Sequence, residues 1–182
     1  MKDSDSDVDA ALMLRVQQRD GGAFEQLMRK HVRPLHSYAY RLCQSSAEAE
    51  EIVQDTFLRV WSRAKTWVPN RVKFTTWLYQ ITRNLCIDRF RKQYAEFDGS
   101  IDLDLLPDTQ TNENKELILA LRQVVQELPE RQRTALVLCQ LQGWSQAETA
   151  SLLSVSVEAV ESLLARARRT LRNKLTTTES PK

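Results

Sequence analysis

Residues 145–171 read SQAETASLLSVSVEAVESLLARARRTL, and this stretch predicts a helix-turn-helix. Ser145 is followed three residues later by Glu148, a capping box that favours a short helix beginning there. A break follows at 154–156, and a longer helix is predicted over 157–175. A short helix, a tight turn and a longer helix form the pattern that places a recognition helix in a DNA major groove.

The predicted longer helix has two faces. Apolar residues recur on one face at three- and four-residue spacing, so this face is expected to pack inward. The opposite face would enter the groove, where Arg166 can address guanine edges and Ser162 can bond a base or a phosphate. It comprises Glu158, Glu161, Ser162, Ala165, Arg166 and Arg169. A purely structural helical hairpin remains the alternative, because the turn pattern alone does not diagnose DNA binding.

The whole chain predicts an all-α fold. Only four Gly and five Pro occur, at isolated points, and strong helix formers fill the stretches between them. Asp9 is expected to cap a first helix that Gly21-Gly22 would end. A second helix is predicted from Ala23 and a third from Ser46.

Charge divides the chain into three parts. Residues 1–92 hold 16 Lys and Arg against 11 Asp and Glu, and residues 115–182 hold ten against seven. Residues 93–114 hold six acidic residues and no basic one, with no sustained helical period. We therefore expect two small helical domains, 1–92 and 115–182, joined by a flexible acidic linker. The linker is either a solvated spacer or a negative strip laid along a basic channel of a partner.

Several classes of protein are disfavoured. Cys43, Cys86 and Cys139 lie far apart, and His31 and His36 are the only histidines, so neither a disulfide framework nor a zinc site is indicated. The amino terminus is acidic, unlike a signal peptide, and no apolar stretch approaches the length of a membrane span. We expect a reduced cytoplasmic protein without metal, cofactor or membrane insertion.

Two further segments carry candidate contact residues. The third predicted helix leaves Leu58 and Trp61 outside its inward stripe, as either an exposed contact patch or part of the core. Residues 65–92 interleave cations with aromatic and amide side chains. Such a mixture suits an unstacked nucleic-acid strand, because rings and guanidinium groups stack on bases while ammonium groups meet phosphates. A plain solvated basic helix is the alternative.

Taken together, the segments resemble the extracytoplasmic-function (ECF) branch of bacterial sigma factors, in the same order along the chain. AEEIVQDTFLRVW at 49–61 is similar to the helix by which the family binds the clamp of the polymerase core. FTTWLYQITRNLCIDRFR at 74–91 is similar to the part that recognises and melts the minus-10 element. LPERQR at 128–133 and the helix-turn-helix look like the domain that reads the minus-35 element as duplex.

This resemblance implies three sets of site residues. Contacts to the clamp of the largest polymerase subunit are expected from Glu51, Gln54, Asp55, Leu58, Arg59 and Trp61. Contacts to the minus-10 element are expected from Trp67, Asn70, Arg71, Lys73, Phe74, Trp77, Arg83, Asn84, Asp88 and Arg91, with the loop 67–73 capturing a base turned out of the opened strand. Contacts to the minus-35 duplex are expected from Arg133, Ser145, Glu158, Glu161, Ser162, Ala165, Arg166 and Arg169.

The recognition helix departs from the family at one point. Relatives commonly show Thr-Val-Lys-Ser-Arg where this chain has AVESL at 159–163. Glu161 thus replaces a cation, removing a phosphate or guanine contact and adding a carboxylate able to accept from a cytosine amino group. The resemblance leaves the promoter preference of this helix open.

The expected function is that of an alternative sigma factor: a non-enzymatic protein that binds the polymerase core and promoter DNA and that an anti-sigma factor controls. A free-standing helix-turn-helix regulator would explain 128–175 but leaves 50–61 unexplained. A hydrolase or nuclease would require Glu50, Glu51, Asp55 and Asp88 to gather as metal ligands, and no nucleophile motif, phosphate-binding glycine loop or positioned histidine accompanies them.

Overall fold

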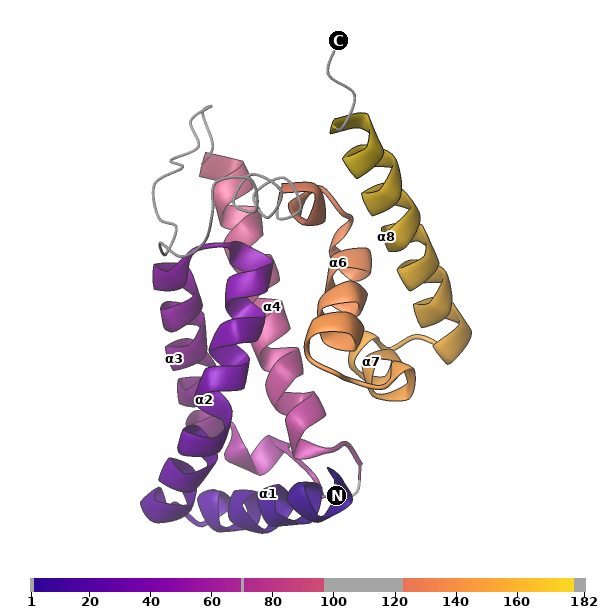
Figure 1. The fold of residues 1–182 in the computed structure, drawn as a ribbon. Coiled ribbons are helices and arrows are strands. Elements are labelled where there is room, and N and C mark those ends of the chain that lie inside the picture. The colour runs from indigo at the N-terminus through magenta and orange to yellow at the C-terminus, as the bar shows by residue number, and fades with distance from the viewer. Residues whose placement is uncertain (1, 70, 97–122, 179–182) are drawn as a thin grey trace, which may run out of the picture. The chain divides into compact units, whose positions relative to one another are not determined.

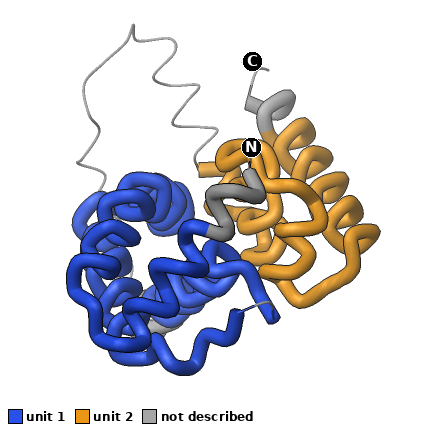
Figure 2. Tube along the Cα trace, turned by 90° about the horizontal axis from the view of Figure 1, so that it is seen from below, with its two compact units in different colours: residues 1–100 blue, residues 101–182 orange. Residues whose placement is uncertain are grey.

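The computed structural model describes residues 2–69, 71–96 and 123–178, and the chain divides into two compact units, 1–100 and 101–182 (Figure 2). All regular structure within the described ranges is helical, which confirms the all-α prediction. The first unit contains α1 (Lys2–Gln17), α2 (Gly21–Cys43), α3 (Ser46–Ser62), the 3-10 turn η1 (Ala64–Thr66) and α4 (Phe74–Glu96) (Figure 1). The second contains α6 (Glu130–Leu136), the π-helical turn η2 (Val137–Leu141), α7 (Gln146–Leu153) and α8 (Val157–Thr178).

The start of the chain differs from the prediction. The helix α1 begins at Lys2, so Asp9 lies in its interior and does not cap it. The two glycines do not end α1 either, because α1 stops at Gln17 and Gly21 opens α2. Asp20 is the cap of α2, and its carboxylate accepts from the backbone N–H of Ala23 at 3.0 Å.

Asp9 instead forms a buried ion pair that joins α1 to α2. Its side chain is buried, with 1% of the residue exposed, and it accepts from Lys30 Nζ at 2.8 Å. The buried ring of His31 shares a hydrogen bond of 2.9 Å with the second carboxylate oxygen through Nε2. Burial by itself raises the pKa of Asp9, but the bonds and charges of His31 and Lys30 outweigh it and hold this pKa below its usual value.

The helices α2, α3 and α4 pack along one another, and α1 crosses one end of them (Figure 1). Leu27, Leu35 and Tyr38 of α2 are fully buried in the core of this unit. A buried hydroxyl pair, Thr56 and Thr82, lies 3.2 Å apart between α3 and α4. Each hydroxyl also donates to the carbonyl four residues before it, so neither polar group is buried without a partner.

The second unit contains the predicted helix-turn-helix. Ser145 and Glu148 form the expected capping box at the start of α7. Ser154 ends α7 in the left-handed region, at φ 55°, and α8 begins three residues later. The helix α6 passes directly into the π-helical turn η2, and Gly143 takes φ 68° after them. At that φ any residue with a β-carbon would be strained.

The predicted linker lies mostly outside the described residues. The helix α4 runs to Glu96 and therefore extends four residues into the stretch 93–114. Residues 97–114 fall in the part of the chain that the structure leaves undescribed.

The Asp9 pair generates a prediction of pH-dependent stability. Replacing Asp9 with Asn should lower the free energy of unfolding by about 3–5 kcal/mol at pH 7, because Lys30 and His31 lose the carboxylate that pairs with them. The folded-state pKa of Asp9 lies below its unfolded value, so this stabilisation is present above about pH 4 and is lost as pH falls through the folded pKa. The measurement is urea unfolding of both proteins from pH 7 to pH 3.

The difference between the wild type and D9N should shrink toward low pH. The control is D55N, since Asp55 is an exposed carboxylate on α3, and its effect should stay within about 0.5 kcal/mol. A difference between the wild type and D9N that does not vary with pH would contradict the role assigned to the ionised carboxylate.

Candidate polymerase-binding and DNA-binding sites

One face of α3 presents an exposed hydrophobic residue beside polar ones. Ser45 caps this helix by accepting from the backbone N–H of Glu48 at 3.3 Å, and Ile52, Val53 and Phe57 turn inward. Leu58 is 66% exposed, the most of any large hydrophobic residue among those described. This exposure decides between the two readings of Leu58 in favour of a surface residue.

Trp61 and Glu51 are partly engaged inside the unit. The ring of Trp61 packs on Phe24, with centroids 5.0 Å apart, and the Arg19 guanidinium lies 5.3 Å from its centroid. Arg19 also donates to the carbonyl of Trp61 at 3.1 Å. Glu51 forms a salt bridge with Arg89 of α4. The expected clamp-binding set therefore has an exposed part, Glu51, Gln54, Asp55 and Leu58, and a half-buried part, Arg59 and Trp61.

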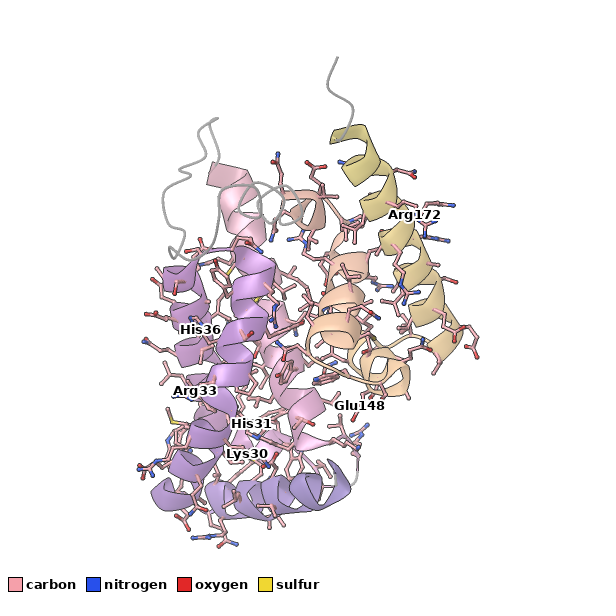
Figure 3. All side chains as sticks on the ribbon, viewed as in Figure 1. Lys30, His31, Arg33, His36, Glu148 and Arg172 are labelled. Atoms are coloured by element: carbon pink, nitrogen blue, oxygen red, sulfur yellow. The ribbon has the colours of Figure 1, made fainter. Side chains whose placement is uncertain are left out.

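A groove of about 410 Å³ lies between α2 and α3, next to this exposed part. Its wall on α3 is formed by Glu50, Val53, Gln54 and Phe57, and its wall on α2 by Met28, Val32, Arg33 and His36. Figure 3 shows Arg33 and His36 on α2. The sequence reasoning missed the α2 wall, although Met28, Val32 and His36 recur every four residues along that helix.

Two aromatic residues expected to face DNA lie in the core. Trp67 is 2% exposed and Phe74 is 1% exposed. The indole Nε1 of Trp67 donates to the carbonyl of Val72 at 3.1 Å. Phe74 packs between Trp67 and His31, with centroid distances of 6.2 Å and 5.6 Å. The core already covers both rings, and their contact with DNA stays a prediction.

The remaining described residues of the basic segment form a polar rim. Arg71, Lys73, Asn84 and Asp88 are exposed, while Trp77 and Arg83 are half-buried. Asn84 and Asp88 lie one turn apart on α4, and Trp77 lies two turns before Asn84, so the three share a face of this helix. Two members of the expected set, Asn70 and the side chain of Arg91, lie outside the described residues.

The outward face of α8 is as predicted. Its six residues, Glu158, Glu161, Ser162, Ala165, Arg166 and Arg169, are all exposed. Val160, Leu164 and Ala167 are buried on the other side. The pKa of Glu158 is lowered by hydrogen bonds from its own backbone N–H and from the Ser156 hydroxyl, so this side chain is ionised at neutral pH. The division of faces is confirmed, and contact with DNA stays a prediction.

Arg133 holds the unit together instead of facing outward. Its guanidinium donates to the side chain of Gln126 at 2.6 Å and to its carbonyl at 2.8 Å, and to the carbonyl of Leu128 at 3.3 Å. These bonds satisfy groups at the end of the helical residues 123–126, and contact between Arg133 and DNA stays a prediction. Ser145 is exposed, but its hydroxyl already donates to Glu148 at 2.8 Å.

Among the described residues, no three His, Cys, Asp or Glu side chains lie together as a metal ion would require. Cys43, Cys86 and Cys139 are free thiols, and burial raises the pKa of Cys43 to about 11. Within the same ranges no helix has the length and apolar character needed to cross a membrane.

Two protein-family models match this chain, one in each unit. The family model described as Sigma-70 region 2 matches residues 27–96, and the one described as Sigma-70, region 4, matches residues 118–171. The ECF RNA polymerase sigma factor SigM of Mycobacterium tuberculosis (strain H37Rv) is 33% identical over 160 residues, which are 88% of this chain and 81% of that protein. The ECF RNA polymerase sigma factor SigW of Bacillus subtilis (strain 168) is 31% identical over 175 residues, 88% and 93% of the two chains.

A solved structure agrees in fold over nearly the whole chain. CnrH, in complex with the cytosolic domain of CnrY, superposes with a TM-score of 0.73 at 27% identity, covering 95% of this chain and 99% of that one. The chain belongs to the ECF RNA polymerase sigma factors.

The effect of replacing Arg133 on the stability of the protein tests whether this residue has a structural role. Replacing Arg133 with Ala should lower the free energy of unfolding by about 2–3 kcal/mol, because three acceptors lose a charged donor. The exposed Arg131, on the same helix, is the matched control, and R131A should change stability by less than about 0.5 kcal/mol. Urea denaturation measures both, and equal effects would show that Arg133 does not act as a cap.

Proposed function

We propose that this chain binds the RNA polymerase core mainly through α3 and directs it to promoters whose two elements are read by the two units. The observation that carries this proposal is Leu58, a large apolar side chain left 66% exposed between polar neighbours and beside a groove of which half the lining residues are apolar. Exposed apolar patches with a polar rim are typical of protein interaction sites. The chain itself catalyses no reaction and acts in the cytoplasm, where the polymerase works.

The minus-10 element would meet the polar rim of the first unit. Arg71 and Lys73 offer cations to phosphates, while Asn84 and Asp88 offer hydrogen-bonding groups to bases of the opened strand. The half-buried Trp77 is the ring of this face that remains partly accessible, since Trp67 and Phe74 are covered. Base stacking is accordingly assigned to Trp77.

The minus-35 element would be read by α8 in the major groove. Arg166 is placed to donate to a guanine, and Glu161 to accept from a cytosine amino group. The carboxylates of Glu158 and Glu161 repel phosphates. They can be accommodated in a groove where the base edges supply hydrogen-bond donors. We propose that Glu161 gives this chain a preference for cytosine in its minus-35 element.

An anti-sigma factor is proposed to control the chain by covering the exposed part of α3 and the adjacent groove. CnrH, which shares this fold, was solved with the cytosolic domain of CnrY bound to it. An inhibitor seated on Leu58 would exclude the polymerase, because both would require the same apolar surface.

The first test is run-off transcription with bacterial core polymerase on a promoter library, with and without the chain. Changing Leu58 to Ala should weaken core binding about tenfold, since a central exposed apolar anchor commonly contributes this much to an interface. The matched control is L14A, because Leu14 is a second exposed leucine, on α1. Core binding unchanged by L58A, or no core-dependent initiation by the wild type, would favour the free-standing DNA-binding regulator.

Two variants of α8 test the minus-35 assignment in the same library. Changing Arg166 to Ala should weaken use of promoters with a matched minus-35 element by about 1–3 kcal/mol, and E161A should remove a preference for cytosine at one position. The control is R168A, since Arg168 is an exposed arginine of the same helix outside the predicted contact set. Equal loss on promoters lacking a minus-35 element would indicate a folding defect and contradict base reading.

A further inference from the structure

The side chain of Gln17, at the end of α1, bonds two backbone carbonyls far away in the sequence. Its Nε2 donates to the carbonyl of Ala64 at 3.1 Å and to the carbonyl of Trp67 at 2.8 Å. A primary amide has two N–H groups, and each is directed at one of these carbonyls. Gln17 thereby joins α1 to both ends of η1.

The two carbonyls lie where α3 is followed by the basic segment. Ala64 opens η1 directly after α3, and Trp67 closes it just before the exposed Val68 and Arg71. Trp67 is held from its other side as well, since its buried indole donates to the carbonyl of Val72 at 3.1 Å. Gln17 therefore secures the backbone at the point from which Val68 and Arg71 project.

The stretch between η1 and α4 is also connected to α1 at its other end, through contacts of Phe74. Phe74, the first residue of α4, packs against His31, and His31 shares the buried hydrogen bond with Asp9. The helix α1 contacts both η1 and α4, and Figure 1 shows it crossing this end of the unit. The helix α1 thus supports both ends of the stretch between η1 and α4.

We propose that Gln17 is a positioning residue for recognition of the minus-10 element, an inference that rests on the proposed function. Gln17 itself is not expected to touch DNA. It sets the backbone from which Arg71 and its neighbours meet the opened strand, and a recognition site needs its groups held to within about 0.5 Å. The role requires a donor, so a glutamate of the same shape would present two acceptor oxygens to two carbonyls and lose both bonds.

The test uses the full chain with polymerase core on a promoter library randomised in both elements. In Q17E the preference among bases in the minus-10 element should flatten about tenfold, because two ordinary hydrogen bonds that hold the segment are lost. Preferences in the minus-35 element, read by the other unit, should not change. This comparison lies within one library, so a smaller amount of active protein scales all promoters equally and leaves both preferences unaltered.

The neighbouring exposed Gln18 supplies the matched control, since Q18E makes the same change of charge one residue past the end of α1. Q17A provides a second variant that removes both bonds without adding a carboxylate, and it should flatten the same preference if Q17E proves too unstable to assay. Core affinity, measured in parallel, should stay within about twofold for all three.

Unchanged minus-10 preferences in both Q17E and Q17A would overturn the proposal, as would an equal flattening of the two elements or an equal effect of Q18E. A wild-type chain that gives no core-dependent start sites would instead overturn the proposed function, so the two failures are distinguishable.

Discussion

The first unit depends on a carboxylate that the fold takes almost completely out of water. An unpaired Asp9 at this depth would be expelled or protonated, so α1 can pack only where Lys30 and His31 meet its two oxygens. Both partners come from adjacent positions of α2 (Figure 3), which fixes the register of the two helices. The ring of His31 then forms a wall for Phe74, and Phe74 for Trp67. The aromatic core of the unit thus adjoins one ion pair.

The packing of His31, Phe74 and Trp67 also explains why the basic segment has a buried aromatic base and a polar rim. Trp67 and Phe74 contribute apolar burial, and their position leaves exposed Arg71 and Lys73 around a covered core. On α3, two neighbouring apolar residues lie on opposite sides of the helix: Phe57 is buried and Leu58 is exposed. An exposed leucine forfeits roughly 2 kcal/mol of burial, which a binding partner can recover. The first unit therefore has two surfaces of different chemistry, an apolar one at Leu58 and a cationic one at Arg71 and Lys73.

Local patterns predicted the parts of this structure that local physics determines. The capping box at Ser145 and the two faces of α8 follow from residues three or four positions apart, and both were foreseen. Asp9 was misread because an acidic residue before an apolar run fits a cap, whereas its partners lie 21 and 22 residues away. Composition could not decide whether Trp67 stacks on bases or on Phe74, since either suits an indole ring. The sequence also did not show that Arg133 would bond Gln126, because that contact depends on how the chain turns between the two residues.

The charge distribution of α8 shows how two modest sites can act together. Its first turns carry Glu158 and Glu161, while Arg166, Arg168 and Arg169 follow. Glu158 lies in the first turn of α8, where a carboxylate interacts favourably with the helix dipole and stabilises the helix. This order of charges also weakens attraction to phosphates at the end of α8 that is proposed to enter the groove, because each cation adds to non-specific affinity and each carboxylate subtracts from it. A DNA-binding helix with this charge distribution would gain sequence discrimination and lose overall affinity. The polymerase that the first unit is proposed to bind would then supply the missing affinity.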